Sequence, residues 1–208
     1  MLLTGALPVH ATALQVSLDT SALAGTDAVL AFDFMDSDCA NNAITISDFL
    51  TDGTLGTPDA PFDGVAGVLP ATVTLSETGD SLIELLQGFT LGTRISFTLD
   101  LTEAASGVSP FDSFALFLLD DSLMPLFATN DLTGADALFA VDIDGTRTGQ
   151  IHRFAPADPS AAVSWTLTSA AVVPAPSPLW LLTIGALGTL GARARPRRAT
   201  PSTLPPSA

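Results

Sequence analysis

Strict alternation of apolar and polar residues constrains the fold of this chain more than any other feature of its sequence. In the segment RISFTLDLT, residues 94–102, Ile95, Phe97, Leu99 and Leu101 alternate with polar or charged residues. A period of two places one face of a β-strand on a core and the other face in water. The same pattern predicts strands at residues 14–20, 30–36, 43–47, 71–77 and 162–169.

Two further runs, residues 114–120 and 137–143, are apolar at nearly every position. This composition is typical of central strands that are covered on both faces. Turn-forming residues separate all of these segments, and helical periodicity is missing between most of them. The sequence therefore predicts an all-β fold, an antiparallel β-sandwich of jelly-roll-like type spanning residues 14–170.

One segment of this domain admits a different structure. Leu82, Leu85 and Leu86 have helical spacing, Asp80 or Ser81 could cap the start of a helix, and Gly88 follows as a stop signal. We expect either one short helix here or an irregular connection across the edge of the sandwich.

The charge of the chain is distributed unevenly. All 22 acidic residues lie between Asp19 and Asp158, whereas four of the seven basic residues lie in the segment from Arg193 to Arg198. A body this acidic repels phosphate backbones, which argues against nucleic acid as a partner, and it attracts divalent cations. Cys39 is the only cysteine, so the fold has no intrachain disulfide.

The residue patterns of common enzyme classes are missing from the sequence. Of the two histidines, His10 lies in the terminal segment and His152 is expected on the surface of a strand. No serine nucleophile motif, phosphate-binding loop or cysteine pair occurs, and no spacing identifies a facing carboxylate pair of the glycosidase type. We therefore predict a non-enzymatic protein with no catalytic residues.

Calcium is the one cofactor for which the sequence offers candidate ligands. Asp36 and Asp38 lie in an Asp/Asn-rich stretch that also contains Asp33, Asn41 and Asn42, and Asp142 and Asp144 precede a glycine turn. Closely spaced carboxylates supply the hard oxygen ligands that calcium requires, although neither stretch completes a twelve-residue calcium loop. The alternative is that these are solvated acidic loops on an acidic surface.

The first 13 residues resemble the end of a secretory signal peptide. They are apolar and finish in a small-x-small pattern formed by Ala11 and Ala13, but they lack a basic segment at the start. We interpret residues 1–13 as the remnant of a signal peptide whose true start lies upstream. The alternative is an ordinary first strand with a frayed end.

The C-terminal region has three consecutive parts. Residues 171–178 form a proline-rich linker, residues 179–192 form an uncharged apolar run, and residues 193–208 form an arginine-rich tail. As a helix the run spans about 21 Å, less than the roughly 30 Å of a hydrocarbon core, so a buried core helix is a fair alternative. Its glycines, Trp180 at one end and arginines at the other favour a transmembrane helix with a cytoplasmic tail.

This arrangement resembles the PEP-CTERM sorting region of exported Gram-negative bacterial proteins. The motif corresponds to Val173, Pro174, Ala175 and Pro176, the helix to residues 179–192, and the basic stop to a set of four arginines. Those arginines are Arg193, Arg195, Arg197 and Arg198. The resemblance implies export across the inner membrane, anchoring by the tail, cleavage by an exosortase-type membrane protease, and transfer to the cell surface or medium.

The sequence departs from the family pattern at two points. Ala175 stands where the motif usually has glutamate, and a further tail follows the arginines. The body also resembles a PEP-CTERM family of unknown function, and such proteins commonly accompany exopolysaccharide and biofilm. We therefore expect an exported surface or extracellular-matrix protein. The alternative is a polysaccharide-binding β-sandwich module, which exposed aromatic residues would mark.

Overall fold

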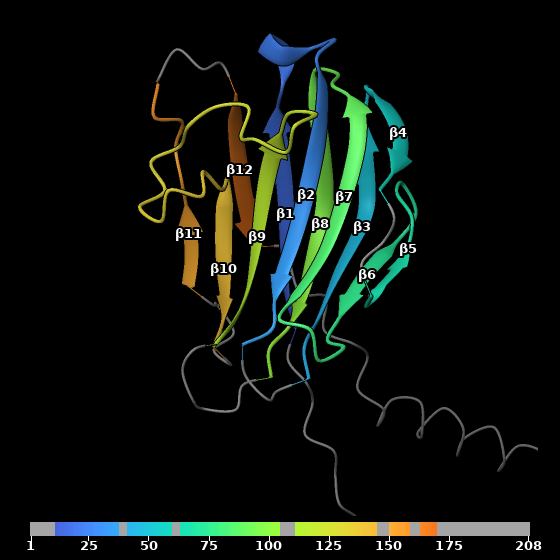
Figure 1. Cartoon of the computed structure of the whole chain (residues 1–208), viewed down its shortest axis with the longest axis vertical. Coiled ribbons are helices and arrows are strands. Elements are labelled where there is room, and N and C mark those ends of the chain that lie inside the picture. Colours follow the sequence, from blue (N-terminus) through green and yellow to red (C-terminus); the bar gives the residue numbers. More distant parts are fainter. Residues whose placement is uncertain are drawn as a thin grey trace, which may run out of the picture. The chain divides into compact units, whose positions relative to one another are not determined.

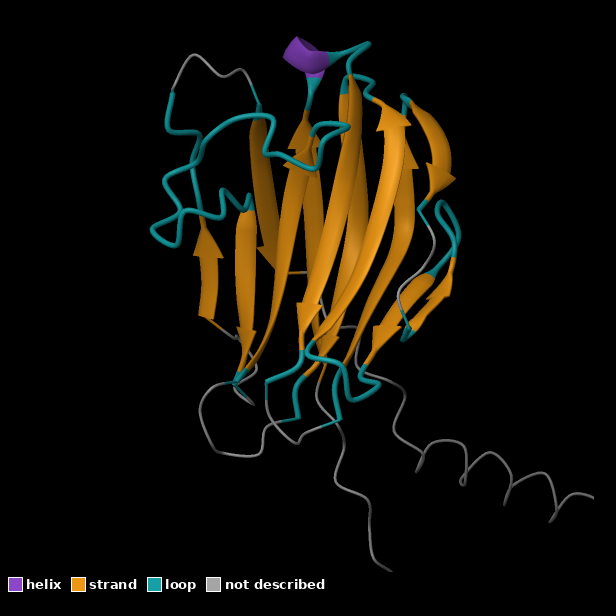
Figure 2. Cartoon of the chain, viewed as in Figure 1, coloured by secondary structure: helices purple, strands orange, loops and turns teal. Residues whose placement is uncertain are grey.

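The computed structural model describes residues 11–37, 41–59, 63–104, 111–144, 150–158 and 163–169. The chain separates into two compact units, Met1–Ala171 and Val172–Ala208, and the described residues all belong to the first. Their regular structure consists of β-strands and one short 3-10 helix, η1 (Ser21–Leu23) (Figure 2). The predicted all-β class is confirmed for this part of the chain.

Two antiparallel six-stranded sheets stack face to face to form the body (Figure 1). Sheet A has the order β12 (Ser164–Ser169), β1 (Ala11–Asp19), β8 (Arg94–Thr102), β3 (Ala43–Thr51), β6 (Val73–Ser76) and β5 (Val65–Gly67). Sheet B has the order β11 (Gln150–Arg153), β10 (Phe139–Ile143), β9 (Asp112–Leu119), β2 (Asp27–Met35), β7 (Leu82–Thr90) and β4 (Thr54–Pro58).

The alternation seen in the sequence decides which side chains enter the space between the sheets. The apolar positions predicted to face inward on β1, β2, β3, β6 and β8 are all buried, whereas Trp165 on β12 is half-buried. The buried residues are Leu14, Val16, Leu18, Leu30, Phe32, Phe34, Ile44, Ile46, Val73, Leu75, Ile95, Phe97, Leu99 and Leu101. Two short strands, β4 and β5, were not anticipated, whereas β11 carries His152 exposed on a strand as expected.

A chain of phenyl rings crosses the core from one sheet to the other. Phe97 of sheet A packs edge-on against Phe32 of sheet B, with ring centroids 5.5 Å apart, and stacks on Phe49 at 6.0 Å. Phe114 continues the chain from Phe32 at 6.5 Å and contacts Phe139 at 6.0 Å. Edge-to-face and offset pairs of this kind add to the stabilisation from apolar burial.

The prediction of a short helix at Leu82–Gly88 is wrong, because this segment is strand β7. It pairs with β2 along its entire length, from Leu82 opposite Met35 to Thr90 opposite Asp27. Ile83, Leu85 and Phe89 point into the core, and Leu82 and Leu86 point out. A short isolated helix is marginal in water, so nine paired residues and a buried face override the helical spacing.

The two apolar runs form β9 and β10 in sheet B. The outer face of β9 carries Phe117 and Leu119, which pack with Val29, Ala31 and Leu86 in a small second cluster. The outer face of β10 carries only Ala140 and Asp142, both half-buried. Apolar contacts on the outer side therefore reach β9 but not β10.

The strands bring several chain segments together at one end of the sandwich, the lower end in Figure 1. Strands β2, β6, β8 and β10 end there, and β1, β3 and β9 begin there. Residues that directly precede or follow these strands therefore become neighbours although they lie far apart in the sequence.

The strand assignment of β7 makes a prediction that separates it from a helix. In a helix Leu82 would share the buried face with Leu85, whereas in the strand Ile83 is fully buried and Leu82 is 38% exposed. We expect Ile83→Ala to lower the free energy of unfolding by about 2–5 kcal/mol and Leu82→Ala by less than about 1 kcal/mol. Urea unfolding of both variants measures this, and the reverse ranking would contradict the strand.

Candidate metal centre

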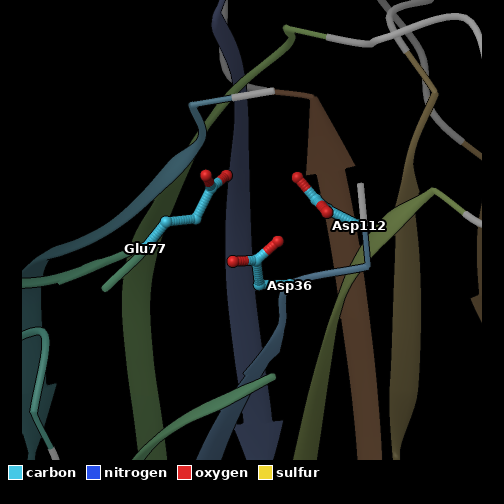
Figure 3. Close-up of side chains that lie close together, drawn as sticks. All are labelled: Asp36, Glu77 and Asp112. Atoms are coloured by element: carbon cyan, nitrogen blue, oxygen red, sulfur yellow. The ribbon is translucent and has the colours of Figure 1, made fainter. Parts of the chain in front are cut away.

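Three carboxylates converge at the lower end of the sandwich. Asp36 follows the last residue of β2, Glu77 follows β6, and Asp112 is the first residue of β9. One oxygen of each lies within 4.8 Å of one oxygen of the others. Figure 3 shows the three groups pointing toward a common space. Asp36 and Asp112 come from sheet B and Glu77 from sheet A, so the cluster spans the two sheets.

The alternation of the strands explains why these side chains point inward. Asp36 lies two positions after the buried Phe34, and Asp112 lies two positions before the buried Phe114. Glu77 likewise lies two positions after the buried Leu75. Each carboxylate therefore continues the inward-facing row of its strand by one step beyond the last apolar residue.

Asn42 connects the cluster to the neighbouring strands. Its side-chain amide donates to Asp112 Oδ2 at 2.7 Å and to the Ala104 carbonyl at 2.8 Å. Its side-chain carbonyl accepts from the Thr102 hydroxyl and the Ala104 N–H, both at 3.0 Å. The backbone N–H of Asn42 donates to Glu77 Oε1. This buried side chain therefore holds parts of both sheets in place.

The local field at the cluster is negative. Burial, the charges of Asp36 and Asp112 and a hydrogen bond with Asp112 raise the pKa of Glu77, the hydrogen bond from Asn42 lowers it, and the net pKa is about 7. Asp112 is fully buried and accepts a hydrogen bond from Ser37 N–H at 2.8 Å. Hard, anionic oxygens around one space are the ligand type of calcium rather than of zinc or copper.

The structure separates the candidate ligands that the sequence suggested. Asp36 joins the cluster, Asp38 lies outside the described residues, and Asn41 is exposed. Asp142 instead contacts His152 Nε2 at 3.0 Å on the surface of sheet B, as an exposed pair. Asp144 follows β10 at the same end, where burial and, to a smaller extent, the charge of Asp144 raise the pKa of Glu103. Asp142 and Asp144 are not members of the three-carboxylate cluster.

Sequence reasoning missed Glu77 and Asp112 as members of the site. A signal was present for Glu77, which lies two positions after Leu75, a residue predicted to face the core. For Asp112 there was no such signal, because the run that begins at Phe114 is apolar on both faces. Their proximity to Asp36 depends on strand order, which the alternation does not specify.

A second acidic pair lies on the outer face of sheet B. Asp33 of β2 and Glu84 of β7 are directly opposite in the strand register. Burial, the charge of Glu84 and their mutual hydrogen bond together raise the pKa of Asp33 to about 7. Burial also raises the pKa of Glu84, with a contribution from the charge of Asp59. The pair is therefore most stable when it holds a proton.

Of the sites that the sequence predicts near the two ends of the chain, the structure describes only the two alanines of the signal-cleavage pattern. Ala11 and Ala13 lie in β1, opposite Thr102 and Asp100 of β8. The sorting motif, the basic stop and the predicted membrane segment 179–192 all lie outside the described residues. Within the part of the chain that the structure describes, no helix is long and apolar enough to cross a membrane.

Removal of the Asn42 side chain should destabilise the protein strongly. Asn42→Ala removes the hydrogen bond that the amide donates to buried Asp112 and the two that it makes with the backbone of Ala104, and we expect a loss of about 2–4 kcal/mol in the free energy of unfolding. Asn41→Ala, at the exposed neighbouring position, should change it by less than about 0.5 kcal/mol. Urea unfolding measures both, and equal effects would show that Asn42 does not connect the strands.

The Asp33–Glu84 pair should make the protein less stable at higher pH. Because the pKa of Asp33 is raised above its unfolded value, its contribution is complete near pH 4 and is lost as pH rises through about 7. Between pH 5.5 and pH 8 we expect the free energy of unfolding to fall by about 2 kcal/mol less in Asp33→Asn than in the wild type. Urea unfolding at the two pH values measures this difference. The control Asp121→Asn, an exposed charge, should retain the wild-type loss. If Asp33→Asn lost as much stability between pH 5.5 and pH 8 as the wild type, the raised pKa of Asp33 would be contradicted.

Comparison with known proteins adds no functional information. No family model matches the chain, and the searches of curated proteins and solved structures give no significant match. Function is therefore argued from the residues of this chain alone.

Proposed function

We propose that this chain is an exported, non-enzymatic β-sandwich protein that an exosortase-type protease sorts at its C-terminus, with a role at the cell surface or in the extracellular matrix. The order of residues at the C-terminus carries this proposal. Val173, Pro174, Ala175 and Pro176 precede an apolar run that ends at an arginine cluster. The run has the composition of a membrane segment, and the arginines favour a cytoplasmic end.

The position of the motif relative to the body supports the proposal. The last described strand, β12, ends at Ser169, and Val173 follows four residues later. Prolines disfavour both helix and strand pairing, so the motif can present an extended backbone to a protease. All core residues of the part that the structure describes precede the motif, the last being Leu167, so cleavage at the motif removes none of them.

The nested strand pairing supports a jelly-roll-like reading of the fold. Strand β1 pairs with β8, β2 with β7, and β3 with β6. A long hairpin rolled into two sheets produces this order, and we infer that β1–β8 form a jelly-roll-like unit. Strands β9–β12 then extend the sheets at the β1 and β2 side.

The alternative function, a polysaccharide-binding module, would use exposed aromatic side chains as stacking platforms. Among the described residues, the exposed large apolar side chains are aliphatic. They are Met35, Leu50, Val68, Leu82, Leu123, Met124 and Leu132. A glycan array probed with the purified protein distinguishes the two functions, since binding at micromolar concentration would favour the module.

The sorting proposal predicts a specific mature protein in the native host. Intact mass measured separately on envelope and medium should show a species that ends between Pro174 and Pro178 and lacks Arg193–Arg198. Pro174→Ala combined with Pro176→Ala should leave uncleaved chain in the membrane fraction, because the motif is then lost. Pro178→Ala is the matched control in the same linker and should be processed normally. Uncleaved wild-type chain in the membrane fraction would mean a plain anchor and overturn the proposal.

A further inference from the structure

The inward-facing rows of both sheets end in polar side chains at the lower end of the sandwich, and we call this set the end plate. It includes the Asp36–Glu77–Asp112 cluster, Asn42 and a fourth carboxylate, Glu103. Glu103 lies two positions after the buried Leu101, so it continues the inward-facing row of β8.

Strand register places Glu103 next to Asn42, which contacts the cluster. Ile44 of β3 is opposite Leu101 of β8 and also opposite Leu75 of β6. One step further along the same rows, Asn42 falls between Glu103 and Glu77. The two hydrogen bonds between Asn42 and the backbone of Ala104, which follows Glu103, agree with this order.

Glu103 is a buried carboxylate with few polar partners among the described residues. The residue is 8% exposed, and neither side-chain oxygen has a hydrogen bond of ordinary geometry among the described residues. The Thr12 hydroxyl lowers its pKa, but burial and the charge of Asp144 raise it. An anionic oxygen buried in this way costs free energy unless a cation or a donor compensates it.

We propose that the end plate binds one calcium ion, held by Asp36, Glu77 and Asp112, and that the ion compensates the buried charge of Glu103. Oxygens on opposite sides of calcium are separated by about 4.6–5.2 Å, twice the metal–oxygen distance, whereas magnesium allows only about 4.0–4.2 Å. The cluster oxygens all lie within 4.8 Å of one another, close enough for one calcium ion to bind all three carboxylates. Three carboxylates supply up to six oxygens, and water completes the shell.

This site would link the two sheets directly. Asp36 and Asp112 belong to sheet B, while Glu77 and Glu103 extend strands of sheet A. An ion that binds only the folded arrangement stabilises it by mass action. The proposal is independent of the sorting signal, because none of these residues lies in the C-terminal region.

The test uses the purified full-length chain in mild detergent, freed of metal with a chelator and then dialysed. Equilibrium dialysis with radioactive calcium should show one ion bound per chain. Addition of 5 mM calcium should raise the melting temperature by roughly 2–9 °C if the dissociation constant is near that of extracellular modules, and magnesium should raise it less. No bound calcium and no shift would overturn the proposal.

Variants assign the binding to the end plate. Glu77→Gln keeps the shape of the side chain and should abolish most of the calcium-induced shift. Glu103→Gln should raise the melting temperature in chelator, because it removes a buried charge, and should also reduce the shift. Asp112→Asn is unsuitable, since two donors already face its carboxylate and it could fail to fold. Asp121→Asn, an exposed control, should keep the full calcium-induced shift. If Glu77→Gln showed the same shift as the wild type, the ion would bind elsewhere and the proposal would be overturned.

Discussion

Apolar contact between the two sheets, centred on the rings of Phe32 and Phe97, is the interaction on which the rest of the structure depends. The chain has a single cysteine, so no intrachain disulfide assists it. Strands β2 and β8, which carry these rings, lie inside their sheets and pair on both sides. Because side chains alternate, burial of this core also fixes the register of each strand, since a shift of one residue would turn the apolar face to solvent.

The same alternation decides what closes the core at its lower end. On β2, β6, β8 and β9 the next inward-facing position beyond the apolar rows carries a carboxylate instead of an apolar side chain. Asp112 is fully buried there and hydrogen-bonded, whereas the oxygens of Glu103 lack such partners among the described residues. Like charges at the end of a core oppose close packing of the sheets, and a bound cation reverses that effect.

How much of this was predictable differs from element to element. Strand β8 follows directly from its sequence, because Ile95, Phe97, Leu99 and Leu101 fit only a period of two. Strand β7 does not, because Leu82, Leu85 and Leu86 fit a helix equally well and pairing with β2, about fifty residues earlier, decides the outcome. The end plate was partly predictable in the same sense. Alternation gives the direction of Asp36, Glu77 and Glu103 but not of Asp112, which precedes a run that is apolar on both faces, and their convergence depends on strand order.

The two proposals meet in the conditions on either side of the membrane. Calcium sites of extracellular modules bind with dissociation constants of about 0.1–1 mM, concentrations found outside the cell and not in the cytoplasm. Before export, the carboxylates of the end plate would repel one another and weaken the link between the sheets. After export, calcium would join Asp36 and Asp112 of one sheet to Glu77 of the other. The body would thus reach full stability at the place where cleavage of the tail leaves it without an anchor.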